Sequence, residues 1–425
     1  MEDLSTKTVC IYDHGLFVSL APLLAGRFKR VYYVSGTAGS FPTTAEYSIG
    51  SGIPGVTRLN DWADAERIED QIDLHVIPDL YLAGKAVRLR RQGARVWGSG
   101  EAEILELDRL RFKTWAADVG LNVGRYEVVR GMDEAEAFMK SHPGWFMKTA
   151  GHAPPGRGDF ETLRSRSYDE VKYRMREIRT RLGDRAERVQ LIFEKPITDA
   201  IELATDCYSV DGQYPDRGVL GLEMKAEGYL GKWVNYGDYP ESLRKVNSAF
   251  SILFKKQHYR NLCPIECRID KKGKAWVLDP CLRFGRPPLS ILMMITNWPE
   301  IFWAGGGGEL VQPQFADKWC AEACLYSDYA EEHPTPIEIP KGLEDHVKLS
   351  NYCISGGRPI VVPMHYKLSG IGSIVATGST MNKAIEKCRE VMKEVTGYDV
   401  KATDSFDGAA EQVAKMKEFG IEAFG

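Results

Sequence analysis

Short apolar runs alternate with amphipathic stretches along the first hundred residues. Runs of β-branched and aromatic residues predict buried parallel strands, and apolar positions three and four apart predict helices. The predicted strands are Thr8–Asp13, Arg30–Gly36, Ile72–Pro78 and Ala94–Gly98, and the predicted helices are Phe17–Phe28 and Leu80–Gln92. This alternation favours an open, doubly wound α/β sheet. No GxGxxG turn follows a strand, so a dinucleotide site is not supported.

Helices and strands are mixed after residue 100. Helices are predicted at Glu101–Val119, Asp133–Ser141, Arg164–Arg188 and Thr380–Thr396, and strands at Arg125–Val129, Gly144–Gly151, Val189–Ile197, Glu202–Gly212, Arg358–Pro363 and Ile371–Thr377. Ser379 is the expected N-cap of the last helix. The arginines of the third helix are expected on a solvated face. The four glycines that end Trp298–Gly308 predict a flexible boundary.

The segment Cys263–Gly285 carries closely spaced charged side chains. Its alternation of apolar and polar residues around the turn Asp270–Gly273 predicts a β-hairpin. Glu266 and Asp279 can then face the same side. Two neighbouring carboxylates repel unless a hard cation lies between them, which favours Mg²⁺ with a phosphate. A surface hairpin with scattered charges is the alternative.

The size and charge of the chain restrict its class. A length of 425 residues predicts two or three domains. The net charge of −4 and the pI near 6.1 do not favour a nucleic-acid partner. No apolar run is long enough to span a bilayer, and the first residues do not resemble a signal peptide. We therefore expect a cytoplasmic protein without a membrane partner.

Nine cysteines predict reduced thiols rather than a disulfide framework. Cys263 with Cys267, and Cys320 with Cys324, share a CxxxC spacing that could supply a zinc site. In the other interpretation, the first pair alternates along a strand and the second pair packs on one face of a helix.

Two lysines and a glycine-containing loop have the chemistry to hold phosphates. Lys113 lies in a predicted helix. Lys148 follows Trp-Phe-Met in an apolar strand, where a lysine without an anion would be costly. The loop that follows contains Gly156, Arg157 and Gly158. Such a loop can place backbone N–H groups over a γ-phosphate. Each of these cations could instead be an ordinary surface residue.

The next strand supplies groups suited to a nucleoside. Glu194 and Lys195 close that strand, Ile197 follows it, and Glu202 lies a few residues further on. A strand-end backbone can read adenine, and a carboxylate can hold ribose hydroxyls. Together with Glu266, Asp279 and Arg283, these residues form a set that could bind ATP and Mg²⁺ and steady a transferring phosphoryl group.

The order and spacing of these segments resemble the ATP-grasp superfamily, and within it the phosphoribosylamine–glycine ligase family. The likeness covers most of the chain from Arg95 onward. The matching segments are Leu105–Lys113, Trp145–Gly151, Gly156–Gly158, Leu191–Lys195, Glu202, Asp279–Gly285 and Gly357–Val362. The resemblance implies an α/β pre-ATP-grasp domain over residues 1–100, an ATP-grasp domain over 101–310 with a lid at about 120–195, and a small α+β domain over 311–425.

The resemblance also implies a function and residue roles. The chain would be an ATP- and Mg²⁺-dependent carboxylate–amine ligase that acts through an acylphosphate on small-molecule substrates, and a homodimer is possible. Lys113 and Lys148 would bind phosphates under the Gly156–Gly158 lid, with Arg157 and Glu194 in the same nucleotide site. Lys195 and Ile197 would frame adenine, and Glu202 would hold ribose. Glu266 and Asp279 would bind the metal, and Arg283 would stabilise the acylphosphate.

Several positions depart from the family pattern. Cys281, a soft ligand, replaces the metal-binding asparagine, and Asp279 stands where glutamate is usual. Pro154 and Pro155 stiffen the lid loop. The NTGGMG substrate signature is absent, and Gly221–Tyr236 takes its place. These departures suggest a different amine substrate. They also leave two alternatives open, a non-catalytic protein that binds ATP or ADP and a kinase that stops at phosphorylation.

Overall fold

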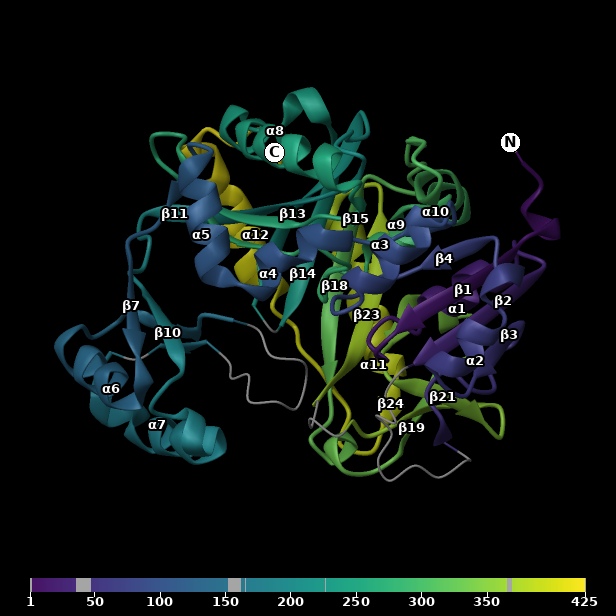
Figure 1. The fold of residues 1–425 in the computed structure, drawn as a ribbon, viewed down its shortest axis with the longest axis horizontal. Coiled ribbons are helices and arrows are strands. Elements are labelled where there is room, and N and C mark those ends of the chain that lie inside the picture. Colours follow the sequence, from purple (N-terminus) through teal and green to yellow (C-terminus); the bar gives the residue numbers. More distant parts are fainter. Residues whose placement is uncertain are drawn as a thin grey trace.

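A computed structural model describes residues 2–35, 47–151, 162–164, 166–225, 227–364 and 369–424. The fold combines a parallel α/β sheet, a small separate sheet with two helices, and a large mixed sheet (Figure 1). The loop residues Gly156, Arg157 and Gly158 lie outside the described residues, as do Pro154 and Pro155. Short 3₁₀ segments are at Leu4–Thr6, Glu69–Gln71, Gly100–Glu103, Gly183–Arg185, Tyr236–Asp238, Tyr329–Glu331, Glu344–His346 and Lys417–Phe419.

The amino-terminal sheet is parallel, with strand order β3-β2-β1-β4-β5. Its elements are β1 (Thr8–Asp13), α1 (Leu20–Ala25), β2 (Arg30–Ser35), β3 (Val56–Leu59), α2 (Trp62–Arg67), β4 (Leu74–Val76), α3 (Ala83–Arg91) and β5 (Arg95–Trp97). Alternate residues of β1 enter two different apolar clusters, with Val9 and Ile11 in one and Cys10 and Tyr12 in the other. Both faces of the sheet are therefore covered, which confirms the doubly wound prediction.

The helix predicted at Glu101–Val119 is interrupted. The structure has α4 (Ile104–Leu107) and α5 (Arg109–Asp118) in its place. Asp108 between them has extended backbone angles, and its side chain accepts a hydrogen bond from the Arg111 N–H at the start of α5. Asp108 also forms an isolated β-bridge with Gly151. The single helix was therefore wrong, because an N-cap and a long-range backbone contact override the helical pattern.

A small subdomain projects from the main body and is called the lid below (Figure 1). Its sheet has the order β7-β10-β8-β9. The elements are β7 (Tyr126–Arg130), α6 (Gly131–Ser141), β8 (Phe146–Thr149), β9 (Leu163–Arg164), α7 (Tyr168–Leu182) and β10 (Gln190–Glu194). The lid has its own apolar core, which includes Met139, Met175 and Phe193. Helix α7 is shorter than the predicted Arg164–Arg188, and its buried face carries Val171, Met175, Ile178 and Leu182.

One large sheet forms the body of the molecule, in the order β20-β23-β18-β14-β13-β11-β16-β17-β6, with β25 paired to β18. Its strands are β6 (Asn122–Val123), β11 (Ala200–Asp206), β13 (Arg217–Met224), β14 (Gly228–Asn235), β16 (Ile265–Asp270), β17 (Ala275–Pro280), β18 (Trp319–Tyr326), β20 (Val347–Leu349), β23 (Gly370–Gly378) and β25 (Lys401–Ala402). Strand β14 pairs with β18, so the sheet runs without interruption past the boundary expected near residue 310.

The remaining elements surround this sheet. They are β12 (Tyr208–Val210), α8 (Glu241–Gln257), β15 (Arg260–Leu262), α9 (Ile291–Met294), α10 (Trp298–Gly306), β19 (Thr335–Glu338), β21 (Tyr352–Ser355), β22 (Arg358–Val361), α11 (Met381–Glu394), β24 (Thr396–Gly397) and α12 (Phe406–Met416). Thr380, not Ser379, is the N-cap of α11, and its side chain accepts from the Lys383 N–H.

The glycine run is not a flexible boundary, because its first two members lie in the packed helix α10. A Cβ on Gly305 would lie 2.5 Å from the Trp97 ring, and one on Gly306 would lie 2.6 Å from Leu74. These glycines allow α10 to approach β4 and β5 closely.

The cysteines pack as thiols. Cys320 and Cys324 lie on strand β18, so their predicted place on a helix was wrong. Within the described residues, no group of three or more His, Cys, Asp or Glu side chains could hold a metal ion. Most of the thiols are buried in the apolar core, which suits free cysteine.

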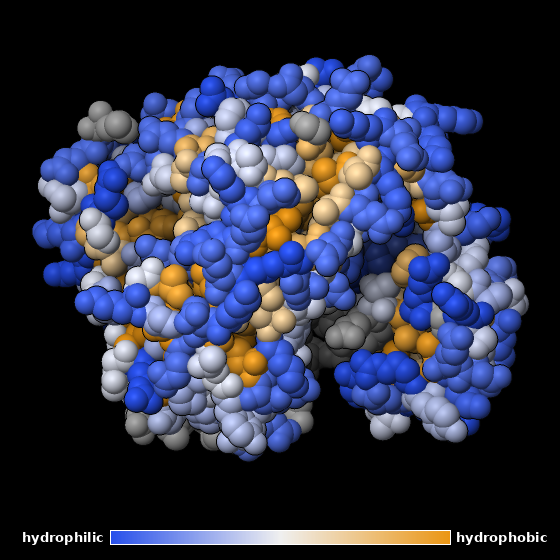
Figure 2. Space-filling view, turned by 180° about the vertical axis from the view of Figure 1, so that it is seen from behind, coloured by the Kyte–Doolittle hydropathy of each residue, from blue (hydrophilic) through white to orange (hydrophobic). Residues whose placement is uncertain are grey.

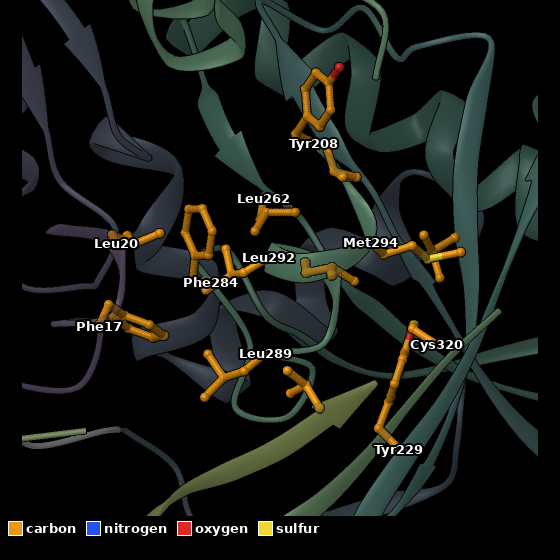
Figure 3. Packing of buried hydrophobic residues seen from close by; sticks show 14 of the residues in the cluster. Phe17, Leu20, Tyr208, Tyr229, Leu262, Phe284, Leu289, Leu292, Met294 and Cys320 are labelled. Carbon is orange, nitrogen blue, oxygen red and sulfur yellow. The ribbon is translucent and has the colours of Figure 1, made fainter. Parts of the chain in front are cut away.

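The main apolar core joins the amino-terminal sheet to the body. Figure 3 shows Phe17 and Leu20 beside Phe284, with Leu289 and Leu292 from the following segment nearby. The Phe17 and Phe284 ring centroids are 5.9 Å apart.

The face seen in Figure 2 is mostly hydrophilic, with small hydrophobic areas between charged side chains, and it is hollowed between the lid and the body. Across the part of the chain that the structure describes, no helix is long and apolar enough to cross a membrane.

Candidate functional site

A cavity of about 400 Å³ lies between lid strands β8 and β10 and body strands β11, β16 and β17. We call it the central cavity. It brings together eight of the residues predicted from the sequence, Lys113, Lys148, Glu194, Lys195, Ile197, Glu202, Glu266 and Asp279. They come from helix α5 and from strands or strand ends of both lid and body. Arg283 is not among the described residues of the lining.

The hairpin that supplies the two predicted metal ligands forms as expected. Strands β16 and β17 pair in antiparallel fashion, and Gly273 in the turn has a φ of 74°, a conformation that favours glycine. The register shifts between Ile265 and Cys267, at the position of Glu266. Glu266 and Asp279 both line the cavity, so the two carboxylates face the same space.

Lys113 and Lys148 form ion pairs with carboxylates that also line the central cavity. The Lys148 Nζ lies 2.6 Å from Asp279 Oδ2 and 2.9 Å from Glu194 Oε2. The Lys113 Nζ lies 2.5 Å from Glu194 Oε1 and donates a 3.0 Å hydrogen bond to the Leu278 carbonyl. The Lys113 side chain is only 3% exposed. These lysines are therefore buried charges with partners, not surface residues.

These ion pairs shift the pKa values of Asp279 and Lys148. Burial raises the pKa of the Asp279 carboxyl, but the Lys148 and Lys113 ammonium groups outweigh burial and hold that pKa below its usual range. Burial lowers the pKa of Lys148, but Asp279 and Glu194 outweigh it, and the pKa is raised. Both shifts favour the charged forms, so the Lys148–Asp279 ion pair persists at neutral pH.

A second ion-paired group that lines the central cavity surrounds Lys225. Its Nζ is 2.7 Å from Glu266 Oε2 and 3.3 Å from Glu202 Oε1. Burial raises the pKa of Glu266, Lys225 opposes this, and Asp279 adds to the rise. The sequence analysis gave Lys225 no role. Its position in Gly221–Tyr236, the segment that replaces the family's substrate signature, was the one feature of the sequence that pointed to a place in the site.

The donor set suits a hard cation together with phosphates. Glu266 and Asp279 supply carboxylate oxygens, and Asp279 Oδ1 accepts no hydrogen bond from the described residues. Mg²⁺ in nucleotide sites is commonly held by one or two carboxylates, phosphate oxygens and waters, so these residues fit it. Cys281 is half-buried, and its Sγ lies 3.8 Å from the Arg283 carbonyl oxygen. A thiol is a poor ligand for Mg²⁺.

Arg283 is held at the edge of the site by carboxylates that the sequence did not single out. Its Nε donates to Glu106 Oε1 at 2.9 Å and lies 3.7 Å from Asp79 Oδ1. Glu106 Oε2 also accepts from the Leu282 N–H at 2.5 Å. Burial lowers the pKa of Arg283, but Glu106 outweighs it and the pKa is raised. Glu106 lies within the family-like Leu105–Lys113 segment, which was the available signal for it.

Part of the central cavity is apolar. Phe146, Pro196, Ile197 and Val277 contribute to its lining, next to Gly124. A Cβ at Gly124 would lie 3.3 Å from Ile197 Cδ1, so glycine keeps this part of the wall open. An apolar slot next to fixed charges can accept a molecule with a flat apolar group and an anionic group.

No protein-family model and no curated protein matches the chain. Among solved structures, it is similar to phosphoribosylamine–glycine ligase from Thermotoga maritima, with 16% identity, a TM-score of 0.66, and coverage of 93% of this chain and 99% of that one. It is similar to N5-carboxyaminoimidazole ribonucleotide synthetase from the same organism, with 13% identity, a TM-score of 0.59, and coverage of 93% and 100%.

A third similar structure is the biotin carboxylase domain of the 2-oxoglutarate carboxylase of Hydrogenobacter thermophilus, solved with MgADP and bicarbonate. The identity is 14%, the TM-score 0.64, and the coverage 93% of this chain and 91% of that one. These similarities show that the chain has the ATP-grasp fold, which confirms the fold expected from the sequence.

Proposed function

We propose that this protein is an ATP- and Mg²⁺-dependent carboxylate–amine ligase that acts through an acylphosphate. The observation that carries the proposal is the pairing of Lys113 and Lys148 with Glu194 and Asp279 across the central cavity. Four charged groups from lid and body are held at one place in an ATP-grasp fold. The ligases and carboxylases among the similar structures support the same class of activity.

The cavity suggests how a nucleotide would lie. Adenine would occupy the apolar part, framed by Lys195 and Ile197, and Glu202 would hold ribose hydroxyls. The phosphates would pair with the Lys113 and Lys148 ammonium groups, which releases Asp279 from Lys148. Asp279 and Glu266 would then hold Mg²⁺, which supplies charge neutralisation on the phosphates.

The chain's residues then serve two transfer steps. An oxygen of the substrate carboxylate attacks the γ-phosphorus of ATP, the bond to the bridging oxygen breaks, and ADP leaves. The amine nitrogen attacks the acyl carbon, loses a proton, and phosphate departs to leave the amide. Lys148 would stabilise charge on the transferring group. We assign Arg283 to the acylphosphate, with Glu106 and Asp79 as the groups that orient its guanidinium.

A non-catalytic nucleotide-binding role is the second candidate. Cys281 favours it, because a soft thiol beside Asp279 would weaken a Mg²⁺ site. Lys148 also already neutralises Asp279. Such a protein would bind ATP or ADP without needing the metal. A kinase that stops at phosphorylation would release its product without needing an amine.

The ligase, the kinase and the non-catalytic role all require the protein to bind a nucleotide, so nucleotide binding is the first measurement. We expect MgATP to raise the melting temperature, and expect EDTA, Asp279→Ala or Lys148→Ala to remove that effect. Asp169→Ala and Lys172→Ala on exposed helix α7 are the matched controls. Stabilisation that survives EDTA would favour the non-catalytic role. ADP release that needs both a carboxylate and an amine would support the ligase, and release with the carboxylate alone would favour the kinase.

A further inference from the structure

Strands β11 and β16 carry residues of the central cavity in a regular order along their lengths. The opposed pairs of the two strands are Ala204 with Glu266, Glu202 with Arg268, and Ala200 with Asp270. Directly opposed residues of neighbouring antiparallel strands lie on the same face of the sheet, as do residues two positions apart on one strand. Glu266, Glu202 and Arg268 therefore share one face, and all three line the central cavity.

These pairs form a scale along the proposed nucleotide. Glu266 marks the position of the metal and the phosphates, and Glu202 marks the ribose. A step of two residues along a strand is about 7 Å. Ala200 lies one such step beyond Glu202 on β11, on the side away from the row of Glu266. Because the base follows the ribose in the same direction, the row of Ala200 is the row of the base.

The Arg268 side chain reaches from the row of the ribose to the row of the base. Its Nη2 donates a 2.8 Å hydrogen bond to the Ala200 carbonyl. This contact fixes the guanidinium one step beyond the position of its own backbone. The same cavity is lined there by the hinge residue Ile197, which lies three positions before Ala200 in the chain. The guanidinium is therefore held toward the apolar part of the cavity that we assign to the base.

Arg268 is not packed into the apolar core. Together with Glu202 and Lys225 it also lines a second cavity of about 760 Å³, whose wall includes Gly408 and Gln412 of helix α12. The three side chains stand between the two cavities, and Arg268 is half-buried. Glu202, directly opposite in the ladder, supplies a negative charge beside the guanidinium. What Arg268 offers a ligand is therefore a flat, weakly hydrated group rather than an uncompensated charge.

We propose that the Arg268 guanidinium stacks against the nucleobase, so that the base as well as the phosphates determines nucleotide affinity. This assignment rests on the proposed function and adds a specificity-determining residue to its nucleotide site. Planar guanidinium groups stack on the faces of aromatic rings, and the attraction is stronger where water is excluded. A purine offers two fused rings to this contact and a pyrimidine offers one. The pocket should therefore prefer purine nucleotides.

Calorimetric titration of the full chain in the presence of Mg²⁺ tests the contact from the side of the ligand. The probes are ADP, UDP and ribose 5-diphosphate, which keeps the ribose and both phosphates but has no base. The affinity of ribose 5-diphosphate is measured by its displacement of ADP, which also detects weak binding. We expect ADP to bind at least tenfold more tightly than either of the other two. Equal affinities for all three ligands would overturn the assignment.

Two variants of Arg268 test the contact from the side of the protein. Arg268→Ala should weaken ADP binding at least tenfold and change ribose 5-diphosphate binding less than twofold. Arg268→Lys keeps the charge but not the plane, and should weaken ADP binding at least fivefold. Arg244→Ala on helix α8 is the matched control and should change neither affinity, because Arg244 also donates to a carbonyl, that of Gly237 at 2.9 Å, but is not in the described lining of either cavity. Equal losses for ADP and ribose 5-diphosphate would overturn the assignment, and so would full ADP affinity in Arg268→Lys.

The ADP titration of the unmodified chain keeps the two proposals separate. Absence of ADP binding contradicts the proposed function. ADP binding whose affinity does not depend on Arg268 contradicts only the stacking contact. Melting temperatures of the variants within about 2 °C of the unmodified chain would show that the fold is retained.

Discussion

The Lys148 ammonium lies 2.6 Å from the Asp279 carboxylate, and this contact joins the lid to the body. Lys148 is on lid strand β8, and Asp279 is on body strand β17, 131 positions further along the chain. In the proposed mechanism both groups meet the nucleotide. The ion pair would therefore hold the lid near the body until phosphates and metal replace it.

Replacing Lys148 with alanine should weaken the lid–body contact. Glu194 and Asp279 would each lose a partner in a mostly buried site, and we expect a stability loss of about 1–3 kcal/mol. Urea unfolding measures it. Lys172→Ala, which removes from α7 a half-buried lysine whose ion-pair partner Asp169 is exposed, should cost under about 0.5 kcal/mol. Equal stability of the two variants would contradict a structural role for the pair.

Replacing Glu106 with alanine should leave Arg283 in place without its main partner. The Glu106 side chain is only 9% exposed, and its loss also frees the Leu282 N–H. We expect a loss of about 3 kcal/mol, because a buried guanidinium would be left with only the more distant Asp79. Nucleotide affinity should be unchanged, since Arg283 does not line the described central cavity. Chemical denaturation and MgADP titration check the two parts separately.

The glycines of α10 should not tolerate a methyl group. Gly305→Ala would place a Cβ 2.5 Å from the Trp97 ring, and we expect a stability loss of about 1–3 kcal/mol. Gly408→Ala on helix α12 is the matched control, because nothing lies within 4 Å of its Cβ. It should stabilise by about 0.5–1 kcal/mol through helix propensity. Thermal unfolding measures both stabilities. A Gly305→Ala variant at least as stable as Gly408→Ala would contradict the close packing of α10 against Trp97.

Cys281→Asn should strengthen Mg²⁺ binding. An amide oxygen is a hard ligand, whereas the thiol it replaces is soft. We expect the Mg²⁺ concentration needed for half-maximal MgADP binding to fall about tenfold, equivalent to about 1.4 kcal/mol. Cys281→Ala, which supplies no ligand, serves as the control. A Mg²⁺ requirement that is identical in all three proteins would place the metal away from this position.

Glu223 should make stability depend on pH above the range of ordinary carboxyl groups. Burial, reinforced by Glu266, raises its pKa from 4.5 to about 8. The unfolded chain releases this proton near pH 4.5, whereas the folded chain retains it until about pH 8. The contribution of this group therefore falls as pH rises through that window and is constant above it. Glu223→Gln should be more stabilising at pH 8 than at pH 5, and urea unfolding at both values would test the sign.

Local sequence patterns predicted many of the elements and several of the site residues of this protein. The alternation along Cys263–Gly285 predicted the β16–β17 hairpin, because a tight turn and period-two burial depend on residues only a few positions apart. The apolar neighbours of Lys148 predicted a buried lysine. The order of the short motifs predicted the ATP-grasp fold and grouped eight residues that line one cavity.

Contacts over long separations in the chain needed the tertiary structure. The break at Asp108 depends on a bridge to Gly151, and the setting of Arg283 depends on Glu106, 177 positions away. The places of Lys225 and Arg268 between two cavities follow from strand order and from the packing of helix α12. Ion pairs and cavities arise from the registers of distant strands, and hydrophobic periodicity within one segment carries no information about those registers. The sequence by itself determined which local elements and charged groups exist, and only the tertiary structure decided which of those charges face one another.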